Sequence, residues 1–150
     1  MDIETVVAET AIRNLGYQFA DAVNRNDVGA LMDLWAGDAA WIIDPPMNVS
    51  AKGSDAIGDL FGTLMSGWTF FHQVPHQGPI TVQGDHATAR MYMHEIGIFK
   101  DGRTHRNWSE YVDRYLRIDG RWLYAERHYH FLYVDGPPMH PDLLGIAVAV

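Results

Sequence analysis

The order of hydrophobic and polar residues predicts helices in the first part of the chain. One apolar stripe, with intervals of three and four residues, runs along a predicted helix over residues 3–26. Its members are Ile12, Leu15, Phe19, Ala22 and Val23. The same periodicity predicts shorter helices over residues 28–36 and about 56–66. An apolar run at residues 40–43 predicts one short strand, and the loop that follows to residue 53 is expected to be irregular.

From residue 69 onward the pattern becomes that of β-hairpins. Strands are predicted over residues 69–83, 86–99, 104–118 and 121–133. The gaps between them hold pairs that favour tight hairpin turns, namely Gly84-Asp85, Asp101-Gly102 and Asp119-Gly120. The chain is therefore expected to be one α+β domain over residues 1–150, with three helices on one face of a curved antiparallel sheet.

The last part of the chain, residues 135–150, is rich in proline and then apolar. It is predicted to leave the last strand as an extended tail. An apolar end favours burial, either at the mouth of a pocket in the same chain or against a neighbouring subunit. A disordered tail is the alternative.

Composition narrows the classes of partner. The net charge is −8 and the basic residues form no cluster, which argues against nucleic acid as a ligand. The chain has no Cys, so disulfides, thiolate nucleophiles and Cys-ligated metals are excluded. No apolar run is long enough to span a membrane, and the N-terminus lacks the features of a signal peptide, so a cytoplasmic location is expected.

The order of these elements resembles that of the nuclear transport factor 2-like superfamily. Within it, the sequence is similar to the SnoaL-like group, which includes scytalone dehydratase and hexachlorocyclohexane dehydrochlorinase. The resemblance is carried by Ala11-Ile12-x-x-Leu15, the run from Leu34 to Trp41, the segment around His76, and Asp119-Gly120-Arg121-Trp122 with Arg127. It implies a cone-shaped, strongly curved mixed or antiparallel sheet, closed by the N-terminal helices around a deep pocket. It also implies a homodimer or homotrimer.

The resemblance implies cofactor-free proton chemistry by a His–Asp pair. The histidine falls on His76, which lies beside bends expected at Pro75 and at Gly78-Pro79. The aspartate position is occupied by Asn24, and the family's arginine falls on Arg127. His94 is a loose counterpart of a second pocket histidine.

Neutral imidazole can accept a proton near pH 7, so His76 is the expected base. Asn24 cannot exchange protons, but its amide oxygen can orient an imidazole. Asp21, one turn earlier on the same helical line, is the alternative acid. Tyr17 shares that line and could donate a hydrogen bond to a substrate oxygen, while His72 is expected to support His76.

Large residues are candidates for a pocket wall, although ordinary core packing is an equal explanation for each aromatic or methionine. The candidates, with His72, are Trp35, Trp41, Phe61, Met65, Trp108, Tyr129 and Phe131. Small hydrophobic or aromatic substrates would suit such a wall.

The last predicted strand places different chemistry on its two faces. Arg127 shares a face with Tyr129 and needs either a ligand oxygen or an acidic partner, such as Asp44 or Asp113. The opposite face carries His128 and His130, a spacing that could serve a metal. The sequence gives them no third ligand at a diagnostic spacing, so no metal and no cofactor are expected.

Two classes of function remain open. The first is a cofactor-independent lyase, acting by dehydratase-type elimination or by retro-aldol loss of a small carbonyl fragment on an aromatic or polyketide-like hydroxy compound. An isomerase or cyclase on a similar ligand would use the same parts. The second is a non-catalytic ligand-binding protein, or an accessory protein similar to a dioxygenase β subunit.

Overall fold

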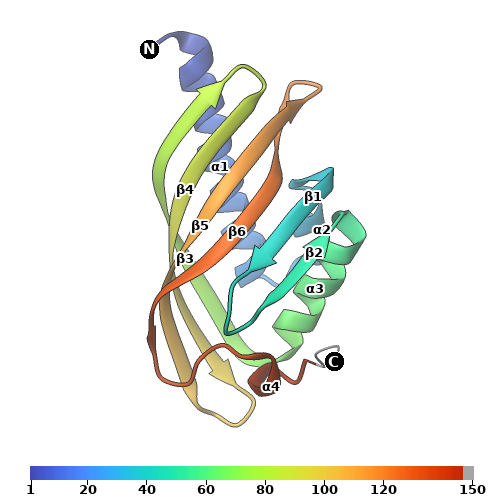
Figure 1. Ribbon diagram of the computed structural model, residues 1–150, viewed down its shortest axis with the longest axis vertical. Coiled ribbons are helices and arrows are strands. Elements are labelled where there is room, and N and C mark those ends of the chain that lie inside the picture. Colours follow the sequence, from blue (N-terminus) through green and yellow to red (C-terminus); the bar gives the residue numbers. More distant parts are fainter. Residues whose placement is uncertain (147–150) are drawn as a thin grey trace.

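The computed structural model describes residues 1–146 as helices packed against a six-stranded sheet (Figure 1). The helices are α1 (Ile3–Asn24), α2 (Val28–Met32), α3 (Ser54–Ser66) and α4 (Pro141–Leu144). The strands are β1 (Trp35–Ile43), β2 (Val49–Lys52), β3 (Trp68–Gln83), β4 (His86–Phe99), β5 (Thr104–Ile118) and β6 (Arg121–Asp135). The predicted α+β class is confirmed.

The sheet is mixed, with the strand order β2-β1-β6-β5-β4-β3. Strands β3 to β6 form the predicted antiparallel meander, and β1 joins its edge by pairing in parallel with β6. The β5–β6 turn has positive φ angles at Asp119 (52°) and Gly120 (77°). Positive φ at both central residues suits the right-handed twist of the flanking strands. The long strands cross the molecule obliquely, and α1 lies behind them (Figure 1).

Two elements around β1 differ from the prediction. The second helix ends at Met32 rather than at Ala36, because Trp35 already pairs with Tyr124 of β6. The expected irregular loop contains the short strand β2, which pairs with β1 from Ala40 to Ile43. Both differences arise from long-range pairing, which local periodicity does not report.

The core lies between α1 and the covered face of the sheet. Phe19 is fully buried and makes edge-to-face contacts with four aromatic rings at centroid distances of 5.8 to 6.0 Å. Its partners are Trp35, Trp41, Tyr111 and Tyr124. Such pairs favour this geometry because the ring edge is positive and the face is negative. This aromatic cluster anchors α1 against the sheet.

Strand β3 bends where its pairing with β4 shifts register, between Gln77 and Ile80. A Cβ atom at Gly78 would lie 2.5 Å from the carbonyl oxygen of Arg90, so only glycine fits this crossing. The bend expected at Gly78-Pro79 is therefore present within one continuous strand.

The tail returns to the body of the protein instead of extending away from it. After β6 it forms α4, whose Leu144 is buried and packs against Gly67 at the end of α3. Met139 is also buried. The expected extended tail is thus corrected for residues 135–146, while residues 147–150 lie outside the described part.

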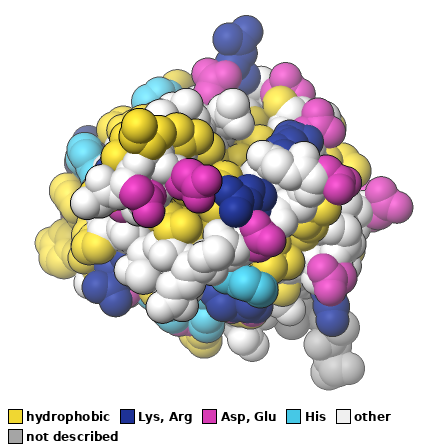
Figure 2. Space-filling model, turned by 90° about the horizontal axis from the view of Figure 1, so that it is seen from above, with side chains coloured by type: hydrophobic (Ala, Val, Ile, Leu, Met, Phe, Trp, Pro, Cys, Tyr) yellow, Lys and Arg dark blue, Asp and Glu magenta, His cyan; other side chains and the backbone are white. Residues whose placement is uncertain are grey.

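The surface agrees with the acidic composition. Figure 2 shows one face, on which basic side chains are dispersed among acidic and hydrophobic ones. Among the described residues, no helix has the length and apolar character needed to cross a lipid bilayer.

Candidate active site

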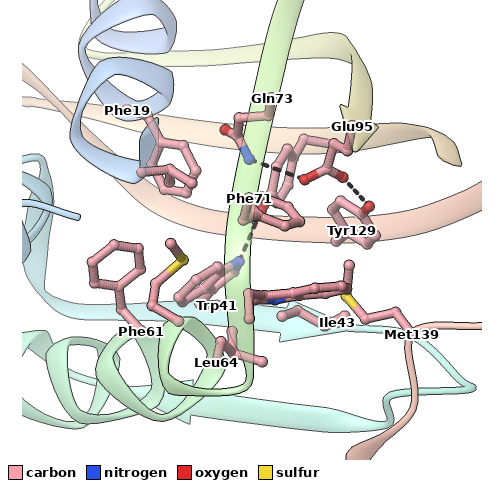
Figure 3. Close-up of a pocket in the computed structure, with 14 residues that line it drawn as sticks. Phe19, Trp41, Ile43, Phe61, Leu64, Phe71, Gln73, Glu95, Tyr129 and Met139 are labelled. Carbon is pink, nitrogen blue, oxygen red and sulfur yellow. Dashed lines mark hydrogen bonds between the residues drawn. The ribbon is translucent and has the colours of Figure 1, made fainter. Parts of the chain in front are cut away.

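An apolar pocket opens between the helices and the covered face of the sheet (Figure 3). Its cavity volume is about 50 Å³. Phe19, Val23, Phe61, Leu64 and Met65 reach it from α1 and α3, and Trp41, Ile43, Trp68, Phe71, Gln73, Glu95, Tyr111, Tyr129 and Met139 complete the wall. An apolar wall that carries a few polar groups is the kind of lining found in sites for small organic molecules.

Glu95 is the ionisable acid in this wall. It projects from β4 and is buried, and among the described residues its carboxylate accepts hydrogen bonds from neutral groups only. Ser109 Oγ donates at 3.1 Å. Gln73 Nε2 also donates at 3.1 Å, and the Tyr129 hydroxyl donates as well (Figure 3). Burial raises the pKa of Glu95 above its ordinary value, although these hydrogen bonds act in the opposite direction. A carboxyl group with a raised pKa is suited to exchanging protons near neutral pH.

Gln73 presents an unused acceptor beside this acid. Its amide nitrogen donates to Glu95, but its buried Oε1 has no hydrogen-bond partner among the described residues. A buried polar atom without a partner is costly. A hydroxyl group of a bound ligand would satisfy it.

Tyr111 presents a donor to the same space. Its hydroxyl oxygen accepts a hydrogen bond from Trp41 Nε1 at 3.1 Å, which leaves its own proton available to a ligand. Burial raises the pKa of Tyr111 above its ordinary value, so the hydroxyl stays protonated. The Arg127 guanidinium lies 3.6 Å from the centre of the Tyr111 ring and makes the phenol more acidic than burial alone would leave it.

A chain of hydrogen bonds connects Glu95 with the tail. The Tyr129 hydroxyl lies between Glu95 and Asn107 Oδ1, and Asn107 Nδ2 lies 2.7 Å from His105 Nε2. His105 Nδ1 lies 2.7 Å from the carbonyl oxygen of Pro137 and donates to it, so Nε2 must accept from Asn107. These hydrogen bonds hold in place the tail segment that carries Met139 over the pocket.

The sequence agrees with a known family over most of its length. A family model described as a SnoaL-like domain matches residues 4–128. This chain belongs to the SnoaL-like domain family. The resemblance to the nuclear transport factor 2-like superfamily, predicted from the order of elements, is therefore confirmed.

Solved structures share the fold of this SnoaL-like protein at low sequence identity. A hexachlorocyclohexane dehydrochlorinase (LinA) of type 2 is 19% identical with a TM-score of 0.84, covering 93% of this chain and 96% of its own. A proposed scytalone dehydratase from Novosphingobium aromaticivorans is 17% identical with a TM-score of 0.81, covering 91% of each chain. The β subunit of a proposed aromatic-ring-hydroxylating dioxygenase from the same organism is 19% identical with a TM-score of 0.70, covering 85% of this chain and 90% of its own. A sequence search of curated proteins gives no match.

Only some of the predicted pocket residues meet in the SnoaL-like pocket. Trp41, Phe61, Met65 and Tyr129 line it. Trp35 is buried in the core beside Tyr124, and Phe131 packs against Tyr129 without reaching the cavity.

The histidines of the central stretch do not face the pocket, which corrects the expectation for His76. Side chains alternate along a strand. Gln73 points inward, so His76, three residues later, is exposed on the outer face of the sheet. His72 is exposed too and stacks on Phe70, and His94 stacks on Trp108 on the same outer face.

Asn24 does not orient His76. Its side chain bridges α1 and β3 instead, donating to the carbonyl oxygen of Gln73 and accepting from its backbone N–H, both at 2.8 Å. Asp21 and Tyr17, the other candidates on α1, are exposed to solvent. Through Asn24, α1 therefore holds Gln73 in place at the site, and Asp21 of the same helix supplies no acid to the pocket.

Arg127 is fully buried but forms a structural ion pair. Its Nε and Nη2 donate to the two carboxylate oxygens of Asp113 at 2.8 and 3.0 Å. Burial alone would lower the pKa of the guanidinium, but the Asp113 carboxylate outweighs it and raises that pKa. Of the two roles left open by the sequence, pairing with Asp113 is the one observed, and Arg127 contacts the pocket wall through the rings of Phe19 and Tyr111.

Sequence reasoning missed Glu95, Gln73 and Tyr111. A signal for Glu95 was present, because it continues the alternation of Ala89, Met91 and Met93, all of which are buried. A carboxylate on an apolar strand face indicates either a buried partner or a functional acid. Gln73 and Tyr111 had no comparable signal.

Proposed function

We propose that the protein is a cofactor-independent lyase that eliminates water from a small aromatic or alicyclic hydroxy compound. The observation that carries this proposal is the buried Glu95 carboxyl group, which faces an apolar pocket and has only neutral partners within residues 1–146. An acid without a cationic partner is free to gain and lose a proton during a reaction.

The proposed elimination uses three groups of the wall. Glu95 removes a proton from the carbon next to a carbonyl group, while Tyr111 donates a hydrogen bond to the carbonyl oxygen as negative charge develops there. The bond between the neighbouring carbon and its hydroxyl group then breaks. The protonated Glu95 returns the proton to the departing hydroxide, which leaves as water, so the enzyme ends unchanged. Gln73 Oε1 would hold the substrate hydroxyl before it departs.

The neighbours in fold support the class of reaction without identifying it. Two of them are named as a dehydrochlorinase and as a proposed scytalone dehydratase, which are elimination enzymes by name. The apolar wall supports a substrate that is small and hydrophobic. Retro-aldol cleavage and isomerisation would need the same base and the same hydrogen-bond donor.

The experiment compares Glu95→Gln with His76→Ala across a panel of β-hydroxy ketones and hydroxylated aromatic ketones. Loss of water is followed by the ultraviolet absorbance of the conjugated product. Glu95→Gln should lower kcat by about 10²- to 10⁴-fold, the usual contribution of a general base. His76→Ala is the matched control and should retain wild-type turnover, because its side chain is exposed on the outer face. Turnover that survives Glu95→Gln and is lost with His76→Ala would reverse the assignment.

A non-catalytic ligand-binding role is the second candidate, favoured by one observation. Both oxygens of Glu95 already accept hydrogen bonds, as in a purely structural acid. A fold neighbour is named as the β subunit of a proposed dioxygenase. Quenching of tryptophan fluorescence by panel compounds, with no water lost from any of them, would favour this role, because Trp41 and Trp68 line the pocket.

A further inference from the structure

A second cluster of polar side chains lies outside the pocket, where β1 ends beside β6. It consists of Asp44, His128 and His130, and Asp44 precedes His128 by 84 residues and His130 by 86. Parallel pairing places Ile43 opposite Tyr129, and the backbone N–H of Asp44 then donates to the carbonyl oxygen of Tyr129 at 3.1 Å. The register therefore sets Asp44 between the two histidines.

The alternation of β6 separates this cluster from the pocket. Tyr129 points into the pocket, so His128 and His130 on either side of it point to the opposite face of the sheet. The side chains of the cluster are each about one-third exposed, at 33% and 30% for the histidines and 34% for Asp44. One side of the cluster is therefore open to solvent.

The donor atoms converge. His128 Nε2 lies 2.6 Å from Asp44 Oδ1, and His130 Nδ1 lies 2.6 Å from Asp44 Oδ2. The imidazole rings are 4.2 Å apart at their centroids, and the donor atoms of the cluster all lie within 4.8 Å of one another. Two imidazole nitrogens and one carboxylate, with a side open to water, form a ligand set that binds zinc and related divalent ions.

The cluster needs little rearrangement to take an ion. Bond lengths of about 2.0 to 2.2 Å to nitrogen and oxygen place tetrahedral ligands roughly 3.4 Å apart. The present distances of 2.6 Å are those of hydrogen bonds, so a metal would replace the shared protons and move the carboxylate outward by less than about 1 Å.

Glu110, the acid next to the cluster, already forms an ion pair with Arg90. Glu110 of β5 stands opposite His130, but its carboxylate pairs with Arg90 at 3.2 Å. Water would therefore complete the coordination. We propose that Asp44, His128 and His130 form a binding site for one divalent transition-metal ion of the zinc type, which fastens the end of β1 to β6.

The test uses full-length protein stripped with EDTA and then titrated with Co²⁺ and Zn²⁺. Wild-type protein should bind one Co²⁺ per chain with visible d–d absorption, and Zn²⁺ should displace it. Asp44→Asn and His130→Ala should each weaken Zn²⁺ binding at least tenfold in calorimetry. His94→Ala is the matched control, because it removes an exposed histidine of the same face that lies outside the cluster.

A second readout does not depend on the visible spectrum. Saturating Zn²⁺ should raise the Tm of the wild type, His94→Ala and Glu95→Gln, and should leave the Tm of Asp44→Asn unchanged, since only an ion bound to the native state stabilises it. Circular dichroism confirms that each variant is folded. Binding of less than one equivalent, or equal weakening by His94→Ala and Asp44→Asn, would overturn the proposal.

Discussion

Glu95 and Asp113 are both buried carboxyl groups on the covered face of the sheet, yet their partners differ in kind. Asp113 receives two hydrogen bonds from Arg127 and a third from Tyr115, so its charge is neutralised. In the part of the chain that the structure describes, Glu95 receives hydrogen bonds only from neutral donors, and it borders the pocket. Burial raises the pKa of both acids, but the Arg127 guanidinium opposes that rise at Asp113, whereas only hydrogen bonds from neutral groups oppose it at Glu95. The burial of an acid does not reveal its role, but its partners do.

Removing Arg127, the cation that pairs with Asp113, should have the largest effect on stability. Arg127→Met leaves Asp113 buried without a positive partner and should lower the free energy of unfolding by about 3 to 5 kcal/mol, measured by urea denaturation. Arg106→Met is the control, since Arg106 is half exposed and 3.8 Å from Asp135, and it should cost less than about 1 kcal/mol. Equal effects of the two substitutions would show that the buried pair is not structural.

Removing the charge of Glu95 should change how stability depends on pH. The pKa of Glu95 is raised in the folded protein, so its contribution to stability is complete below the ordinary glutamate pKa and is lost as pH rises through the folded value. Each unit of that rise corresponds to about 1.4 kcal/mol. Glu95→Gln should therefore gain stability relative to the wild type between pH 5 and pH 8 in urea denaturation.

The amide of the Glu95→Gln variant fits the existing network. The side chain of Gln73 can turn so that its unused Oε1 accepts from the new amide. Asp113 is present in both the wild type and Glu95→Gln, so its own titration cancels in the difference between their free energies of unfolding. A constant difference in stability from pH 5 to pH 8 would mean that Glu95 has an ordinary pKa.

The sequence was sufficient for most of the secondary structure. The bounds of β4 and β5 match the predicted strands at residues 86–99 and 104–118, because turn residues and alternation fix hairpins locally. The pairing of β1 with β6 and of β2 with β1 was not predicted, because it joins segments that local patterns do not relate.

The site was harder to predict, because a shift of one residue along a strand moves a side chain to the other face of the sheet. His76 and Gln73 lie on one strand, and their odd separation sends one outward and the other inward. The spacing of bends around Pro75 did not fix that choice, which depends on the register shift of β3 between Trp68 and Phe70. The contacts of Asp44 with His128 and His130 could not be predicted either, since they depend on the register of the parallel pairing between β1 and β6.

The smallest expected effect concerns one hydrogen bond to Glu95. Ser109→Ala removes the donor at 3.1 Å from Oε1, and a carboxylate that loses a donor to its charged form titrates at a higher pH. The pKa of Glu95 should rise further, and stability near neutral pH should fall by about 1 kcal/mol. A carbon-13 NMR titration of the glutamate carboxyl groups measures the shift without a substrate. Ser50→Ala on β2, an exposed serine, is the control and should leave the Glu95 titration where it is in the wild type. A lowered or unchanged Glu95 pKa in Ser109→Ala would mean that this hydroxyl does not support the charged carboxylate, and Tyr129 and Gln73 would then remain as its supporting donors.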